Sequence, residues 1–113
     1  MFDRKTAQSF GAYPLRLIWV PIELPMNDYP VLFSMSVPKR KFRKAADRNQ
    51  LRRRIREAYR LHKHILYEAL AESEKQYGFM LLYTAKEALP YEDIEKGIQK
   101  MIRRFLKDLG MMN

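Results

Sequence analysis

The order of apolar and polar residues along the 113-residue chain predicts three strands. Residues 13–20 are rich in strand-forming side chains, and residues 31–37 alternate apolar side chains with smaller or polar ones. Prolines, Asn and Asp cluster between these segments, so we expect the two strands to pair as a hairpin with a long loop. Residues 79–83 form a short continuous apolar run, which is typical of a buried strand. Residues 1–12, before the first of these strands, are polar and predict no strand.

Two further segments have helical periodicity. The longer one begins near Asp47, which with Gln50 three residues later resembles a capping box, although a start as early as Ala45 also fits. Its pattern continues to about residue 75, and Gly78 is the expected break. The second helix begins after Pro90, presents a regular apolar stripe and is stopped by a glycine near the C-terminus.

The predicted order is therefore strand, strand, long helix, strand and helix. This succession predicts an α+β fold, a small α/β sandwich with the helices on one side of the sheet. A chain of this length is one domain by size, so we assign residues 1–113 to a single domain with one core. Hydrophobic residues make up 47% of the chain, which argues against disorder.

The longer helix carries its positive charge on one side. When successive residues are placed about 100° apart, an apolar stripe fills an arc of about 80°. The stripe consists of Leu51, Ile55, Ala58, His62, Ile65 and Ala69. A separate arc of roughly 140° forms what we call the cationic ridge. The ridge consists of Arg48, Asn49, Arg52, Arg53, Arg56, Arg60 and Lys63. Arg54 leaves the ridge, and Glu57 lies beyond its edge.

The composition favours a polyanionic partner. The formal net charge is +9 and the pI is about 9.9, and residues 37–60 hold half of the 22 Lys and Arg residues. This balance favours phosphate-rich partners over small-molecule substrates. There is no cysteine, which excludes a disulfide framework and thiol chemistry. No apolar run is long enough for a secretory signal or a membrane span, so we expect a cytoplasmic protein with no membrane partner.

A charged helix face can simply be solvated. Solvated helices usually mix acids with bases at i,i+4, whereas four arginines from Arg48 to Arg60 are stacked one turn apart with no acid on the same strip. Like charges at this spacing repel by a few tenths of a kcal/mol per pair, and a bound polyanion would relieve that repulsion. The planar fork of Arg also suits bidentate phosphate contacts. The ridge is therefore predicted to bind nucleic acid.

The spacing within residues 48–60 resembles the signature of the bacterial ribonuclease P protein subunit. That family reads Arg-Asn-Arg, an apolar residue, Lys/Arg-Arg, two variable residues, then Arg-Glu or Arg-Gln. The matching basic and amide positions are Arg48, Asn49, Arg52, Arg53, Arg56 and Arg60. Residues 37–46 are similar to the strand end and loop before the family's helix. There are two departures, because Gln50 replaces the second Arg and Arg43 stands where many members have Gly.

The resemblance implies the ribonuclease P protein fold, which is of the ribosomal S5 domain 2-like type. This fold has a mixed sheet, a long basic helix and a C-terminal helix. It also has an extra short strand before the long helix and a left-handed strand–helix–strand crossover. An additional N-terminal helix of the family is truncated in this chain, with Phe2 matching its end.

The resemblance also implies the partners and their roles. The family's RNA subunit is catalytic and holds most of the Mg²⁺, and the protein binds this RNA and the 5′ leader of precursor tRNA. We expect a monomer in a 1:1 complex with the RNA. The expected RNA contacts are Lys39, Arg40, Lys41, Lys44, Arg48, Asn49, Arg52, Arg53, Arg56 and Arg60. The leader-groove candidates are Phe2, Tyr13, Arg16, Ile18 and Trp19.

The residues predict no catalytic group or metal site in the protein itself. Glu92, Asp93 and Glu95 lie together, but acids are expected at a helix N-terminus. His62 and His64 are about 200° apart on the helix and cannot clamp one ion. His62 falls on the apolar side and is expected to be a packed histidine.

Two other functions fit the same ridge. One is a structural RNA-binding protein of ribosomal type with no part in cleavage. The other is a DNA-binding protein whose ridge enters a major groove. A basic-zipper version is excluded because no leucine heptad follows Arg60.

Overall fold

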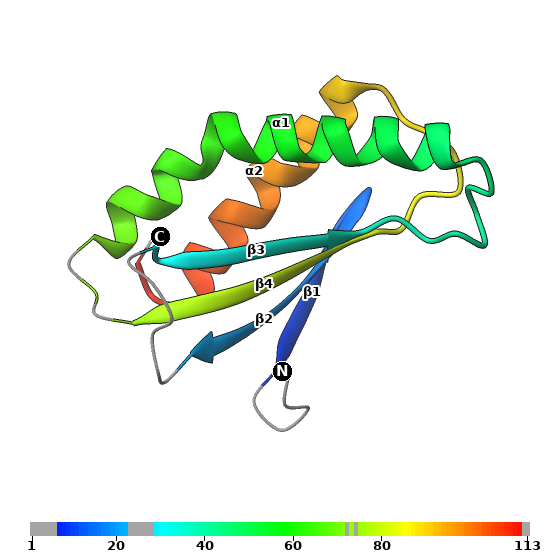
Figure 1. Cartoon of the computed structure of the whole chain (residues 1–113). Coiled ribbons are helices and arrows are strands. Elements are labelled where there is room, and N and C mark those ends of the chain that lie inside the picture. Colours follow the sequence, from blue (N-terminus) through cyan, green and yellow to red (C-terminus); the bar gives the residue numbers. More distant parts are fainter. Residues whose placement is uncertain (1–6, 23–28, 72, 74, 112–113) are drawn as a thin grey trace.

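The computed structural model describes residues 7–22, 29–71, 73 and 75–111. The predicted α+β class is confirmed, with both helices packed on one side of a mixed sheet (Figure 1). In chain order the elements are β1 (Gln8–Ala12), β2 (Leu15–Ile22), β3 (Val31–Ser36), α1 (Ala45–Leu70), β4 (Gln76–Tyr83) and α2 (Tyr91–Asp108).

The strands form one four-stranded sheet in the order β1-β2-β4-β3. β2 pairs antiparallel with both β1 and β4, whereas β3 pairs in parallel with β4. The predicted hairpin between residues 13–20 and 31–37 is therefore wrong, because β4 lies between these two strands. β4 is almost entirely buried, so a central position, with a partner on each edge, suits its continuous apolar sequence.

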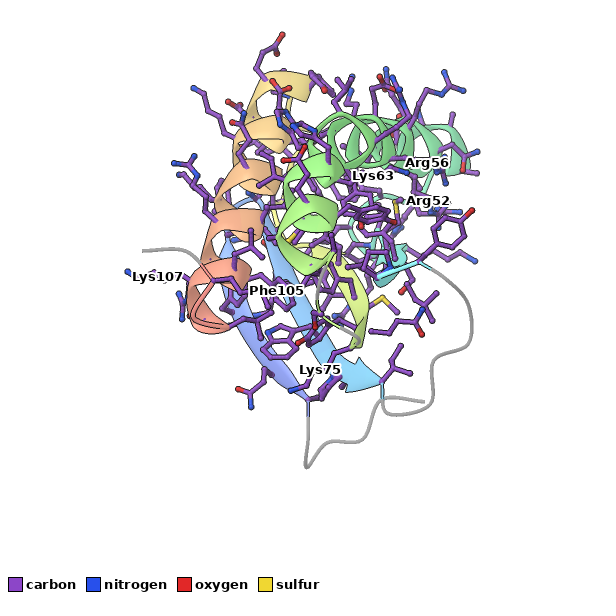
Figure 2. The ribbon with its side chains drawn as sticks, turned by 90° about the vertical axis from the view of Figure 1, so that its left-hand side faces the viewer. Arg52, Arg56, Lys63, Lys75, Phe105 and Lys107 are labelled. Carbon is purple, nitrogen blue, oxygen red and sulfur yellow. The ribbon has the colours of Figure 1, made fainter. Side chains whose placement is uncertain are left out.

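The connection from β3 through α1 to β4 is a crossover between parallel neighbours. Figure 1 shows β3 and β4 pointing the same way beneath α1, and Figure 2 shows β4 to the left of β3 as the two strands recede from the viewer. In Figure 2 the chain therefore passes from β3 on the right, over the sheet through α1, to β4 on the left. With the strands pointing away from the viewer, this anticlockwise path is a left-handed crossover, the hand that the resemblance implies.

The short strand β1 was missed by the hydrophobic pattern. Only Phe10 and Ala12 of its residues are buried, opposite Leu17 and Leu15 of β2. Two apolar positions are too few to stand out as an alternation, and the strand is defined by its pairing with β2. The extra strand that the resemblance places before the long helix is filled by β1.

One face of the sheet carries most of the core. Residues alternate along the strands, so every second side chain points to the helices. The fully buried members include Leu15, Leu17, Phe79, Leu81 and Tyr83, together with Phe105 of α2. Burying one such side chain stabilises the fold by roughly 1.5–3 kcal/mol relative to leaving it exposed.

The long helix begins at Ala45, the earlier of the two predicted starts, and ends before the predicted residue 75. It starts at Ala45 with Lys44 at the N-cap and has no side-chain cap, so the capping box of Asp47 and Gln50 is wrong. Asp47 still lies in the first turn, where its charge is favourable at the positive end of the helix dipole. The helix ends at Leu70, and Gly78 is part of β4 rather than a helix break.

α2 lies close to the turn between β1 and β2. A Cβ atom at Gly97 would be 2.9 Å from Cδ of Pro14 and 3.2 Å from the carbonyl oxygen of Ala12. Only glycine allows this approach, because neither a proline ring nor a backbone oxygen can move aside easily. The predicted stop after α2 is confirmed, with Gly110 at a φ of 75° and the Met111 N–H bonded to the Leu106 carbonyl.

Candidate nucleic-acid interface

α1 is held to the rest of the protein by one face. Its buried residues are Leu51, Ile55, Ala58, Tyr59, Leu66 and Leu70. The ring of Tyr59 stacks on Phe33 of β3, with centroids 4.0 Å apart and planes 9° apart. The buried stripe therefore drifts round the helix, so that Leu66 and Leu70 are buried while the predicted Ala69 is exposed. At about 100° per residue Leu66 and Leu70 fall at the angles of Arg48 and Arg52, so a single fixed arc does not describe the buried side of the whole helix.

The cationic ridge lies on the side of α1 that faces away from α2. Figure 2 shows its members Arg52, Arg56 and Lys63 on that side of the helix. Asn49, Arg53, Arg56 and Arg60 are exposed, whereas Arg48, Arg52 and Lys63 are half-buried. The structure thus brings the predicted ridge residues together along about four turns of one rigid helix. Such a row of fixed cations is suited to binding a phosphate backbone.

Arg48 has a structural role that the sequence did not reveal. Its Nη1 donates hydrogen bonds to the carbonyl oxygens of Phe42 at 2.7 Å and of Arg43 at 3.0 Å. These bonds tie the basic loop to the first turn of α1, where a capping side chain would otherwise act. In the part of the chain that the structure describes, no residue other than glycine has a positive φ. Arg43 therefore replaces the family's glycine without strain.

The basic loop of residues 38–44 leads into the ridge. Its lysines and arginines are exposed, while Phe42 is buried against Tyr83 with ring centroids 5.6 Å apart. Lys41 Nζ also donates to the Thr84 carbonyl at 3.1 Å. The buried ring anchors the loop, so Lys39, Arg40 and Lys44 are presented next to the start of α1.

The last ridge arginine does have an acidic partner. Arg60 donates two hydrogen bonds to the Glu57 carboxylate, one turn away on α1. The hydrogen bonds from Arg60 lower the pKa of Glu57 below its usual value, because they stabilise the charged carboxylate. Glu57 is not a member of the ridge, but its pairing with Arg60 lowers the net positive charge at this end. The ridge is most strongly cationic between Arg48 and Arg56.

Arg54 points away from the ridge, as its helical angle predicts, but it is not a free surface charge. Its Nη1 donates to the Leu89 carbonyl at 2.7 Å, in the loop before α2. The same loop is held by Tyr83, whose hydroxyl donates to the Glu87 carbonyl at 2.6 Å and accepts the Leu89 N–H at 3.0 Å. Arg54 thus joins α1 to the entry of α2.

The sheet face opposite the helices, which we call the open face, is the second part of the site. The strand register and the alternation place on it Ser9, Arg16, Ile18, Leu32, Ser34, Ser36, Met80 and Leu82. Both helices lie on the other side of the sheet (Figure 1). Arg16 is exposed, while Ile18, Met80 and Leu82 next to it are half-buried. The open face therefore combines an apolar floor with one cation and several hydroxyl groups.

The leader-groove candidates are divided by this geometry. Arg16 and Ile18 lie on the open face. Trp19 points the other way and packs edge-on against Phe105 of α2, with centroids 5.0 Å apart, so it is half-buried against the core. Tyr13 lies in the turn between β1 and β2 and is 67% exposed. Phe2 lies outside the described residues. Strand parity places Ile18 and Trp19 on opposite faces of the sheet. It could not say which of them faces the helices, because the register with β4 was unknown.

One histidine of α1 and one acid of α2 are structural partners. His62 Nε2 lies 2.9 Å from Oε2 of Glu95, which also accepts a hydrogen bond from the Tyr91 hydroxyl at 3.4 Å. Glu95 therefore joins the two helices rather than only serving the helix N-terminus. No group of three His, Asp or Glu side chains suited to holding a metal ion occurs among the residues described. Within those same residues, no helix is long and apolar enough to cross a membrane.

Comparisons with known proteins agree with the motif. Residues 4–106 match the family model described as Ribonuclease P. The "Ribonuclease P protein component" of Porphyromonas gingivalis strain W83 is 32% identical over 100 residues, which cover 86% of this chain and 70% of that protein. The protein of the same name from a second strain of that species is 33% identical over 99 residues, again covering 86% and 70%. A third, from Chlorobaculum tepidum, is 39% identical over 85 residues, covering 71% and 53%.

Replacing Arg54 with Ala should lower stability. The substitution leaves the Leu89 carbonyl without its charged donor, and hydrogen bonds to charged groups are worth about 1.5–3 kcal/mol. We therefore expect the free energy of unfolding, measured by urea denaturation, to fall by about 1.5–2 kcal/mol. Arg53→Ala is the matched control, because it removes the same exposed-helix charge from the neighbouring ridge position and should change stability by less than about 0.5 kcal/mol. Equal reductions for the two variants would show that the Arg54–Leu89 bond does not stabilise the fold.

Proposed function

Because the chain belongs to the ribonuclease P protein family, we propose that its cationic ridge and basic loop dock on the catalytic RNA while its open face receives the 5′ leader of precursor tRNA. The chain is a protein component of that ribonucleoprotein, which matures the 5′ ends of tRNA. The observation that carries the proposal is the ridge itself. Its arginines match the family signature and project from one rigid helix that is anchored by its opposite face.

The energetics favour RNA docking by the ridge. Each phosphate that Arg or Lys neutralises releases counterions, and this entropy gain drives binding. The neighbouring arginines Arg48, Arg52 and Arg56 repel one another by a few tenths of a kcal/mol per pair in the free protein, and bound phosphates remove that cost. Their planar forks also bind phosphate oxygens in pairs.

The division of labour follows from the chemistry. The RNA subunit would hold the Mg²⁺ ions that activate water at the scissile phosphate. The protein would act through charge: it neutralises RNA phosphates, so that the folded RNA needs less Mg²⁺ to overcome its own repulsion. We propose one protein per RNA, acting as a monomer in the cytoplasm.

The open face is proposed to hold the leader as a single strand. Bases would lie over Ile18, Met80 and Leu82, and the guanidinium of Arg16 would pair with a leader phosphate or stack on a base. None of the residues that the structure places on this face is aromatic. Because aromatic stacking usually supplies roughly 1–3 kcal/mol per base, we expect this face alone to give only a modest leader preference.

Reconstitution with a bacterial ribonuclease P RNA tests the proposal. The protein alone should cleave nothing, the RNA alone should cleave precursor tRNA only at high Mg²⁺, and the mixture should restore cleavage at the mature 5′ end at low Mg²⁺. The double variant Arg52→Ala/Arg56→Ala should need more protein for the same rate. The slope of log affinity against log salt should drop by about one for each phosphate that is no longer neutralised.

Lys75→Ala is the control for charge in this experiment, since Lys75 is exposed and lies on neither the ridge nor the basic loop. It should leave both the rate and the salt slope unchanged. Cleavage by the protein without RNA would overturn the assignment of the chemistry to the RNA. Failure to stimulate the RNA at low Mg²⁺ would instead favour a structural RNA-binding protein of ribosomal type.

The open face can be tested with leaders of different length. Affinity of the reconstituted complex should rise between tRNAs with no leader and tRNAs with about eight leader nucleotides. Arg16→Ala should reduce that gain on the order of tenfold, because it removes a charged partner of the leader. Trp19→Ala should destabilise the fold by about 3–5 kcal/mol instead, because Trp19 packs into the core. A leader-dependent gain that Arg16→Ala leaves intact would remove the open face from the site.

A further inference from the structure

α2 carries a second row of cations that the proposed function does not use. The α2 row consists of Lys96, Lys100, Arg103 and Lys107. They are separated by four, three and four positions, so they occupy one strip about 60° wide and roughly 16 Å long on the helix. All four are exposed. The buried stripe of α2 is on the opposite side of the helix, so this strip is held outward.

The four cations are not neutralised by neighbouring acids. The ion pairs found within the described ranges join Arg60 to Glu57, His62 to Glu95 and Arg104 to Asp108, and none includes a member of the α2 row. The contrast with Arg104 is informative. Arg104 lies beside the row, bonds Asp108 at 3.0 Å and stacks over the Phe10 ring at 4.9 Å, so its charge is used within the fold. The α2 row instead keeps three adjacent like-charge pairs, each of which opposes helix formation slightly.

The α2 row and the cationic ridge lie on opposite flanks of the helix layer. Figure 2 shows Lys107 pointing away from the protein on one flank, whereas Arg52 and Arg56 project on the other. Both helices cover the same face of the sheet, and the open face is on the opposite side of the sheet. A large RNA that docks on the ridge is therefore well placed to reach the α2 row with another segment. A leader strand bound on the open face is not well placed to reach the α2 row.

The chemistry of the row suits a phosphate backbone. Three of its four residues are lysines, which act as flexible point charges toward phosphate oxygens. Both aromatic residues of α2 are turned inward, since Phe105 is fully buried and Tyr91 packs against the core. The row therefore offers no ring on which a base could stack, in contrast to sites that read single strands.

We propose that the α2 row binds the phosphodiester backbone of a second, helical segment of the catalytic RNA, so that the protein bridges two RNA segments, one on each flank of its helix layer. This inference rests on the proposed function, because it takes the same RNA as the ridge. The two surfaces are far enough apart on separate helices for their contributions to add.

A charge-neutral row is the direct test. The variant Lys96→Gln/Lys100→Gln/Arg103→Gln/Lys107→Gln keeps good helix formers at every position, and its thermal unfolding verifies the fold. With bacterial ribonuclease P RNA alone as the probe, we expect affinity at about 0.15 M salt to fall roughly tenfold or more, and the salt slope to fall by about three. In combination with Arg52→Ala/Arg56→Ala the reductions in slope should add. Lys75→Gln should leave both the RNA affinity and the salt slope unchanged, whereas the matched single variant Lys100→Gln should lower both.

Lysine footprinting gives a second readout that does not need a variant. Lys96, Lys100 and Lys107 should react with an acetylating reagent in the free protein and be protected when the RNA subunit binds, as measured by mass spectrometry. Lys75 should stay reactive in both states. Protection that appears only after precursor tRNA is added would overturn the assignment of this surface to the RNA subunit.

The outcomes separate this inference from the proposed function. If the ridge variant loses affinity and the α2 variant does not, the α2 row is only a solvated face and the proposed function stands. If neither variant loses affinity for the RNA, the docking of the ridge fails and the inference fails with it. Weaker binding by both variants, with additive reductions in salt slope, supports the bridge.

Discussion

The packing of α1 by one face decides how the rest of the protein meets its partner. Tyr59 stacks on Phe33 of β3, and Leu51 and Ile55 are fully buried beneath the helix. This packing fixes the rotation of α1 about its own axis, so the ridge must point to solvent. Both helices then cover the same face of the sheet, and the open face is left on the other side (Figure 1). One packing arrangement thus produces the two separate surfaces that we propose for the catalytic RNA and the 5′ leader.

Arginine side chains have two roles in this account: some hold loops of the fold, and others form the proposed RNA-binding ridge. Arg48 and Arg54 direct guanidinium groups to backbone carbonyls at the start of α1 and before α2. Those bonds hold the loops that frame the ridge. Arg52, Arg53 and Arg56 lie along the ridge instead, where Arg52 bonds only its ridge neighbour Asn49 among the contacts found in the described residues. Because Arg is always charged and its fork is planar, the same residue type can serve as a loop anchor and as a phosphate ligand. The positive charge of the chain therefore cannot be equated with its binding surface.

The sequence was sufficient for the packing stripe and ridge of α1, but it was insufficient for the ends of that helix and for long-range strand pairing. The apolar stripe at Leu51, Ile55 and Ala58 and the opposing ridge follow from helical periodicity alone. The position of β4 between β2 and β3 does not, because strand pairing depends on which residues meet across dozens of positions. The face occupied by Trp19 was unpredictable for the same reason, since it depends on the register with Phe79. The bond from Arg54 to Leu89, and that from Arg48 to Phe42, are tertiary interactions with no signal in the local pattern.

Site-directed photo-crosslinking tests most directly whether two faces serve two RNAs. The chain has no cysteine, so Asn49→Cys on the ridge and Ser36→Cys on the open face each give a unique attachment point for a crosslinker. Both positions are exposed. In a complex with catalytic RNA and precursor tRNA, we predict that the ridge position crosslinks to the catalytic RNA and the open-face position to the 5′ leader. Crosslinks from both positions to the same RNA segment, or an exchange of the two targets, would contradict the account.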